Sequence, residues 1–328
     1  HLTYWQSELA GEIPELVLPF DHPRPAVPNR GGRSLTVPLD ADIAATVRAM
    51  SRGLGVGASV IFLAAFKILL SRYSGQQDIV VGMPTMGRRE KRFEDLIGYF
   101  VNVVAIRTRL DPDASIGAIA KQLRETVYRA LDHAAYPFPA LVRALNVARH
   151  EDGRSALYQV GYVFQNASEK AEAFEWRFLD NVVQEGEIDL DLEVIEGSDG
   201  FALKFNYNRD LFEPISIERI AAEYVALLAD GLERPQLPNR RLSTAKRGAD
   251  PTPDDLPSDG EFVSVAEAFA LRAAAAPDVT ALVWADDPGI SMSYGELDRR
   301  SDAIAARLRR DGVKQGDRVG LLVRRSLD

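Results

Sequence analysis

The chain has 328 residues, a length that indicates two units of ordinary domain size. Hydrophobic residues make up 46% and charged residues 27%, and the net charge is −9, so the chain lacks the basic surplus that a nucleic-acid partner requires. The absence of cysteine excludes disulfides and thiolate chemistry, and no run of about 18 apolar residues predicts a membrane span. These features favour a cytoplasmic protein that acts neither on nucleic acid nor in a membrane.

The four histidines, His1, His22, His133 and His150, lie far apart in the sequence. None forms the helical His-Glu-x-x-His pattern of a zinc site. We therefore expect no metal site and no directly bound cofactor, and a lone histidine is more often structural than catalytic.

Residues 1–33 begin with a short helix-like piece and continue into a proline-rich stretch. Pro19, Pro23, Pro25 and Pro28 rule out a continuing helix and favour an extended conformation. This segment is predicted to be a connector laid across a surface.

Residues 34–234 alternate between strand and helix patterns and predict a mixed α/β fold with a substantial sheet. Strands are expected at 35–39, 78–85, 99–110, 157–165, 188–195 and 201–207, and helices at 40–51, 60–73, 115–134 and 215–232. Ser59 is a candidate cap for the second helix, and Gly75 is expected to end it.

Residues 235–260 contain five prolines and two glycines, a composition typical of a linker. Beyond it, helices are expected at 263–276 and 293–310, and strands at 281–284 and 318–323. So few elements cannot bury a good core. Residues 261–328 are therefore interpreted as a truncated unit.

Several motifs in consistent order resemble the condensation domains of nonribosomal peptide synthetases. Ile97-Gly-Tyr-Phe-Val-Asn102 is similar to IGxFVNT, and His133-Ala-Ala-Tyr-Pro-Phe138 is similar to HQDYPFE. Arg154-Ser-Ala-Leu-Tyr-Gln-Val and the later Ile188-Asp-Leu-Asp-Leu192 follow as in that family. The resemblance covers residues 2 to about 234.

This resemblance implies a lobe of the chloramphenicol acetyltransferase type, facing a second lobe across a substrate tunnel. The family's HHxxxDG motif, whose second histidine faces the acceptor amine, does not occur here. We therefore expect residues 34–234 to be the C-terminal lobe of a condensation domain, with no catalytic residue of its own. Amide bond formation between carrier-bound substrates is the implied reaction. The expected partners are upstream and downstream carrier proteins with their phosphopantetheine arms, and the missing lobe.

Met292-Ser-Tyr-Gly-Glu-Leu297 resembles LTYxEL, the first core motif of adenylation domains. The glycine-rich phosphate loop of that family is missing. The resemblance thus implies the start of an adenylation domain, with ATP and magnesium used only by the complete domain and the rest of that domain as a further partner.

Five residues of the motifs are candidates for the tunnel wall: Phe100, Asn102, Tyr136, Phe138 and Gln165. Ordinary core packing is the competing interpretation for both phenylalanines. Asn102 could equally serve to tie strands together, and Tyr136 could simply end a helix before proline.

Gly98, Arg154 and Asp189 are structural candidates within the motifs. Asp189 belongs to the acidic run Glu187, Asp189, Asp191 and Glu193, whose alternation favours a solvated strand edge over a metal site.

Several alternatives remain open. The chain could be a structural docking platform for carrier proteins, or a free-standing acyltransferase, which the linker and the adenylation-like segment argue against. Within the family, Asn102 favours amide formation over heterocyclisation or epimerisation. Phe138-Pro-Ala-Leu-Val142 resembles condensation domains that accept acyl groups from polyketide modules.

Overall fold

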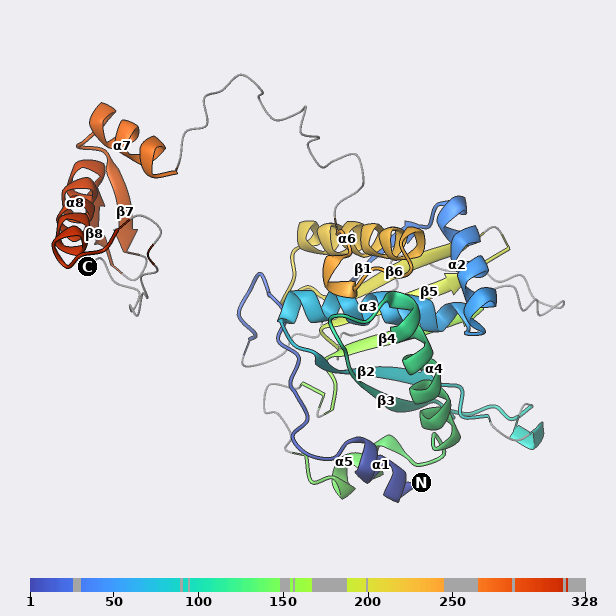
Figure 1. Ribbon diagram of the computed structural model, residues 1–328. Helices are drawn as coiled ribbons and strands as arrows, with labels where there is room; N and C mark the ends of the chain where they lie inside the picture. The colour runs from blue at the N-terminus through green and yellow to red at the C-terminus, as the bar shows by residue number, and fades with distance from the viewer. Residues whose placement is uncertain are drawn as a thin grey trace. The chain divides into compact units, whose positions relative to one another are not determined.

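The computed structural model describes residues 1–25, 31–88, 91–93, 95–147, 154–155, 157–166, 188–198, 200–244, 265–284, 287–314 and 317. The chain divides into two compact units, His1–Asp250 and Pro251–Asp328 (Figure 1). The first unit holds the hydrophobic core and a six-stranded sheet.

The sheet of the first unit has the order β1-β6-β5-β4-β2-β3. Parallel pairing joins β4 to β2 and to β5, whereas every other neighbouring pair is antiparallel. Its strands are β1 (Gly32–Pro38), β2 (Asp78–Thr85), β3 (Asn102–Arg109), β4 (Val160–Asn166), β5 (Leu190–Glu196) and β6 (Phe201–Asn208). The mixed α/β fold predicted from the sequence is confirmed.

The helices of the first unit are α1 (Leu2–Glu8), α2 (Ala41–Leu54), α3 (Ala58–Ser74), α4 (Ile116–Asp132), α5 (Phe138–Ala144) and α6 (Pro214–Glu233), with short 3₁₀ turns η1 (Lys91–Phe93) and η2 (Asn239–Arg241). Figure 1 shows α3 between α4 and α6, lying across the sheet. Gly75 ends α3 in the left-handed conformation, as predicted, and Ser115 caps α4 by accepting a hydrogen bond from Ala118 N.

Helix α3 is buried on every side. All eleven residues from Val60 to Leu70 are buried, and they include one charged residue, Lys67. Its Nζ donates to Ile79 O at 2.9 Å and to Ile106 O at 2.7 Å, on the two neighbouring strands β2 and β3. Burial lowers the pKa of Lys67 to about 7. A neutral amine has two N–H donors, which the two carbonyl oxygens satisfy.

The two faces of the sheet differ because side chains alternate along each strand. Tyr162 points to the helix layer, where its hydroxyl donates to Ser59 O of α3 at 2.6 Å. Gly82 and Gly161, which pair with each other, face the opposite side. A Cβ on Gly82 would lie 2.4 Å from the Tyr158 ring, so only glycine allows the ring to lie against the sheet there.

Four expectations from the sequence are wrong. Ser59 lies inside α3, whose N-cap is Gly57, because the helix starts one residue before the predicted cap. Residues 99–101 precede β3, which begins at Asn102. Helix α5 was not predicted, because Tyr136-Pro137 indicated only the end of the preceding helix. Asp191 and Glu193 of the acidic run do not lie on a strand edge, because β5 is an interior strand with β4 and β6 as neighbours; Glu187 lies outside the described residues.

The second unit contains α7 (Val265–Ala275), a hairpin of β7 (Thr280–Trp284) and β8 (Asp287–Ser293), and α8 (Tyr294–Arg310). Ser293 caps α8 by accepting a hydrogen bond from Glu296 N at 3.3 Å. Strand β8 was not predicted, and the strand expected at 318–323 lies outside the described residues.

No single helix within the described residues is long and apolar enough to cross a membrane. Helices α2 and α3 reach the required length and hydropathy only together, and they are bent by 106° at the break between them.

The buried amine makes stability depend on pH. Unfolded lysine is protonated below its ordinary pKa near 10.5, whereas folded Lys67 releases its proton above about 7. The free energy of unfolding should therefore rise between pH 7 and 9 by on the order of 1 kcal/mol per pH unit from this group. Urea unfolding of Lys67→Met should lack this increase.

The exposed Lys121 of α4 offers a matched control. Lys121→Met should keep the same pH dependence as the wild-type chain. If Lys67→Met and the wild-type chain changed in parallel with pH, Lys67 would be protonated in the folded state.

Candidate functional site

Asn102, the first residue of β3, fastens the segment that leads from α4 to α5. Its Nδ2 donates to Ala134 O and to Tyr136 O, both at 2.8 Å. Its Oδ1 accepts a hydrogen bond from Phe138 N at 3.0 Å. Three bonds from one amide account for most of its capacity. The side chain therefore determines where α5 begins.

The same segment is held from its other side by α1. The Trp5 indole donates to His133 O at 3.1 Å, and the Tyr4 ring stacks on the His133 ring with centroids 4.1 Å apart. His1 Nδ1 lies 2.8 Å from His133 Nδ1. Burial raises the pKa of the Tyr4 hydroxyl to about 12, and the nearby Glu8 carboxylate adds to this shift. His133 is thus held by residues that pack and hydrogen-bond with it.

Among the tunnel candidates, Asn102, Tyr136 and Phe138 lie together, and the Phe138 ring packs on Tyr158 with centroids 5.5 Å apart. Gln165 is exposed near the end of β4, on the side of that strand opposite Tyr162.

Phe100 packs against other partners. It is half-buried, and its ring packs on Phe93 at 5.8 Å and beneath the Arg88 guanidinium at 4.3 Å. Phe100 is therefore not a core residue, because residues 99–101 precede β3 and lie outside the sheet. Gly98 is exposed in the same loop.

The other two motif residues hold the connector. Asp189 is 3% exposed and receives a hydrogen bond from Arg24 Nη2 at 2.5 Å. Arg154 forms an ion pair with Glu15. Further along the acidic run, burial raises the pKa of Asp191 to about 6, an effect opposed by the hydrogen bond from Asn206.

Arg107 is the main anchor of the connector, and the motif comparison did not single it out. The guanidinium donates to Ala10 O and Glu12 O, each at 2.8 Å, while Nε and Nη2 bind the Asp78 carboxylate. Together with Arg109, Arg107 holds the pKa of Asp78 below its usual value, although partial burial opposes this. The sequence did contain a signal for this anchor: an arginine among apolar residues of a predicted strand, where a charged side chain requires partners.

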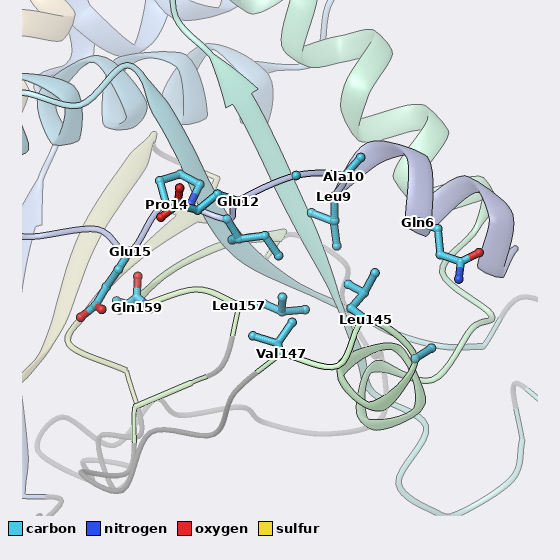
Figure 2. A pocket seen from close by; sticks show the side chains of 13 residues that line it. Gln6, Leu9, Ala10, Glu12, Pro14, Glu15, Leu145, Val147, Leu157 and Gln159 are labelled. Atoms are coloured by element: carbon cyan, nitrogen blue, oxygen red, sulfur yellow. The ribbon is translucent and has the colours of Figure 1, made fainter.

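A pocket of about 630 Å³ lies between the connector and the end of α5. In Figure 2, the side chains of Leu9, Leu145, Val147 and Leu157 surround it, with Gln6, Glu12 and Glu15 nearby on the connector. Its full lining consists of Gln6, Leu9, Ala10, Gly11, Glu12, Ile13, Pro14, Glu15, Ala144, Leu145, Val147, Leu157 and Gln159. None of the predicted tunnel residues lines it.

The residues that line this pocket can bind a small molecule. Among the described residues that line it there is no histidine, cysteine, serine, threonine, lysine or tyrosine, and the ionisable side chains are the carboxylates of Glu12 and Glu15. Within the described part of the chain, no three histidine or acidic residues are placed to hold a metal ion.

Residues 1–250 match the sequence profile described as "Condensation domain". The chain belongs to the condensation-domain family. Residues 269–328 match the profile described as "AMP-binding enzyme", in the second compact unit. Two motif residues of this domain are thus bonded to each other: the backbone N–H of Phe138, at the start of α5, donates to the side chain of Asn102.

Curated relatives contain this condensation domain within much longer proteins. Polyketide synthase PksN of Bacillus subtilis (strain 168) is 34% identical over 345 residues, which cover all of this chain and 6% of the relative. A linear gramicidin synthase of Brevibacillus parabrevis is 36% identical over 341 residues, which cover all of this chain and 4% of the relative.

Solved structures share the fold. The X-domain from teicoplanin biosynthesis superposes with a TM-score of 0.67 at 27% identity, covering 74% of this chain and 56% of that one. The four-domain nonribosomal peptide synthetase AB3403 gives a TM-score of 0.69 at 22% identity, covering 96% of this chain and 25% of that one.

The role of Asn102 can be tested by an amide-to-acid change. Asn102→Asp places a carboxylate against two carbonyl oxygens that have lost their donors. It should lower the free energy of unfolding by roughly 2–4 kcal/mol, the cost of two unsatisfied buried acceptors. Amide hydrogen exchange should quicken in α5. Urea unfolding and exchange mass spectrometry provide the measurements.

Gln165→Glu is the same chemical change at an exposed strand position. It should alter stability by less than about 0.5 kcal/mol. Equal effects of the two substitutions would show that Asn102 has no special fastening role.

Proposed function

We propose that this condensation domain forms an amide bond between a carrier-bound acyl or peptidyl thioester and the amine of a carrier-bound aminoacyl group. The observation that carries the proposal is the family match over residues 1–250, together with a preformed pocket beside the Asn102-anchored segment. Relatives named as gramicidin and bacitracin synthases support this assignment.

Within that reaction, the role proposed for this condensation domain's own residues is to position the substrates. Attack of a neutral amine on a thioester depends mainly on orientation, which can supply on the order of 7–11 kcal/mol of barrier reduction. The pocket lining lacks an imidazole, and HHxxxDG does not occur in the 328 residues. We infer that the histidine is supplied by another polypeptide segment. Phe100 and Gln165 are proposed to contact other parts of a substrate.

The organisation proposed for the chain is a connector at 1–33, a C-terminal condensation lobe at 34–234, a linker at 235–260 and the start of an adenylation domain at 261–328. The proposed partners are carrier proteins that present phosphopantetheine arms, an N-terminal condensation lobe and the rest of the adenylation domain. ATP and magnesium would act only in that complete domain. A cytoplasmic location remains a prediction.

A docking platform without catalysis is the second candidate. The observation that favours it is the same lining, whose described residues include no histidine, cysteine, serine or lysine. The two functions differ in whether amide appears when an HHxxxDG-bearing lobe is added.

The donor can be proposed at the level of its class. Phe138-Pro-Ala-Leu-Val142 resembles condensation domains that accept acyl groups from polyketide modules, and one relative is named a polyketide synthase. Polyketide-type donors should therefore turn over faster than aminoacyl donors, and equal or faster turnover of aminoacyl donors would contradict this preference.

Mass spectrometry of carrier-bound products tests the main proposal. With one donor-loaded and one acceptor-loaded carrier protein, the 328-residue chain alone should give no amide. Adding the N-terminal condensation lobe of the same synthetase, in trans or as a fusion, should give amide product. Product from the chain alone would contradict the positioning role. Bound carriers with no product after the lobe is added would favour the docking platform.

A further inference from the structure

The residues that follow α6 fold back onto the turn between β3 and α4. Asn239 N donates to Ala114 O at 2.9 Å. Pro238 forms an isolated antiparallel bridge with Ser115, the N-cap residue of α4. We call residues 235–243 the strap, because they cross this turn after α6 has ended. They form the first part of the linker proposed above.

One side chain fastens the middle of the strap. Asn239 is 6% exposed, and its Nδ2 donates to Asp111 O at 2.6 Å and to Ala114 O at 2.8 Å. Both hydrogens of the amide are therefore used. The backbone carbonyl of Asn239 accepts a hydrogen bond from the Arg72 side chain of α3. Asn239 thus joins the strap to α3 and to the turn before α4.

The end of the strap is held by one apolar and one polar contact. Leu242 is 3% exposed and belongs to the hydrophobic core. Ser243 N donates to Asp230 Oδ2 at 2.7 Å, and Arg234 binds the same carboxylate. Because Asp230 belongs to the last turn of α6, the strap returns to the helix that precedes it.

Several side chains of the strap face solvent. Its exposed residues are Pro235, Gln236, Arg240 and Arg241. The ion pair between Arg240 and Asp113, at 2.6 Å, joins side chains that are both more than half exposed, so it contributes little. The strap therefore depends mainly on Asn239 and Leu242. A segment with so few buried side chains can open while the rest of the domain stays folded.

The state of the strap changes the length of the covalent connection to the second compact unit. When the strap is closed, this connection leaves the strap at Thr244. When the strap is open, the connection starts at Arg234, directly after α6. Residues 235–243 span about 30 Å when fully extended. Opening the strap therefore lengthens the tether by up to this distance.

We propose that the strap sets the reach of the second unit, with Asn239 as the residue that fastens it. A shorter tether raises the effective concentration of one tethered unit at the other. The closed strap therefore raises this concentration, and the open strap gives the second unit a longer reach. The inference concerns the tether, so it does not depend on the reaction proposed above.

Paired spin labels can test the strap in the intact 328-residue chain, which contains no cysteine of its own. The first pair is Arg241→Cys in the strap and Glu218→Cys on α6, both at exposed positions. Double electron–electron resonance should give one narrow distance distribution for this pair, because the closed strap holds its label on the domain. The second pair, Glu218→Cys and Asp302→Cys on α8, reports the distance between the two units.

Two graded variants and a control open the strap or leave it closed. Asn239→Asp removes both donors and places a carboxylate against two carbonyl oxygens. It should add a broad population to the first pair, displaced by up to about 25 Å, the extended length of residues 235–241. Combining it with Leu242→Asn should make this population dominant, and the second pair should shift to longer distances in the same order. Arg240→Gln removes only the exposed ion pair and should leave both distributions unchanged.

A broad distribution for the first pair without any further substitution, or unchanged distributions in both Asn239 variants, would overturn the proposal. So would opening that occurs only together with loss of far-ultraviolet circular dichroism, because the segment would then be part of the core. If the first pair opened and the second pair did not shift, the strap would not set the reach of the second unit.

Discussion

The arrangement of the first unit follows from the burial of α3. Eleven successive buried residues leave this helix no polar face, so sheet, α4 and α6 must enclose it. That enclosure occupies one face of the sheet and leaves the other for the connector, which Arg107 anchors there. The Tyr158 ring also lies on that second face, against Gly82. The candidate pocket therefore depends on a helix that does not line it.

Asn102, a motif residue, and Arg107, which lies outside the motifs, both act mainly by holding the backbone of other segments. The Asn102 amide forms hydrogen bonds with the backbone of Ala134, Tyr136 and Phe138. The Arg107 guanidinium binds the Asp78 carboxylate and two connector carbonyls. Such groups fix distances between segments that are remote in sequence, which is what a positioning site requires. A side chain with this task tolerates little change. The chemistry of the lining can then vary while the walls stay in place.

The sequence predicted most of the elements, because apolar periodicity and caps are local properties. Gly75 and Ser115 end and begin helices where the pattern indicated. It failed where non-local contacts decide the outcome. The role of Asn102 as a tie between segments could not be predicted, because its three backbone partners are remote in sequence; its role in the tunnel wall stays a prediction. The pocket was invisible for the same reason: Glu12 and Leu145 are ordinary residues that meet only in the fold.

The placement of β1 has a consequence for synthesis. Gly32 of β1 pairs with Asn208 of β6, so the first strand in the sequence has no partner until the last strand has been synthesised. On the ribosome, β1 emerges long before β6 and cannot join the sheet until nearly the whole lobe has been made. β2 and β3 are joined by a far shorter stretch of chain and can pair first, with α3 and α4 to cover them. The lobe should therefore close late, with an unpaired strand as the segment that chaperones must protect.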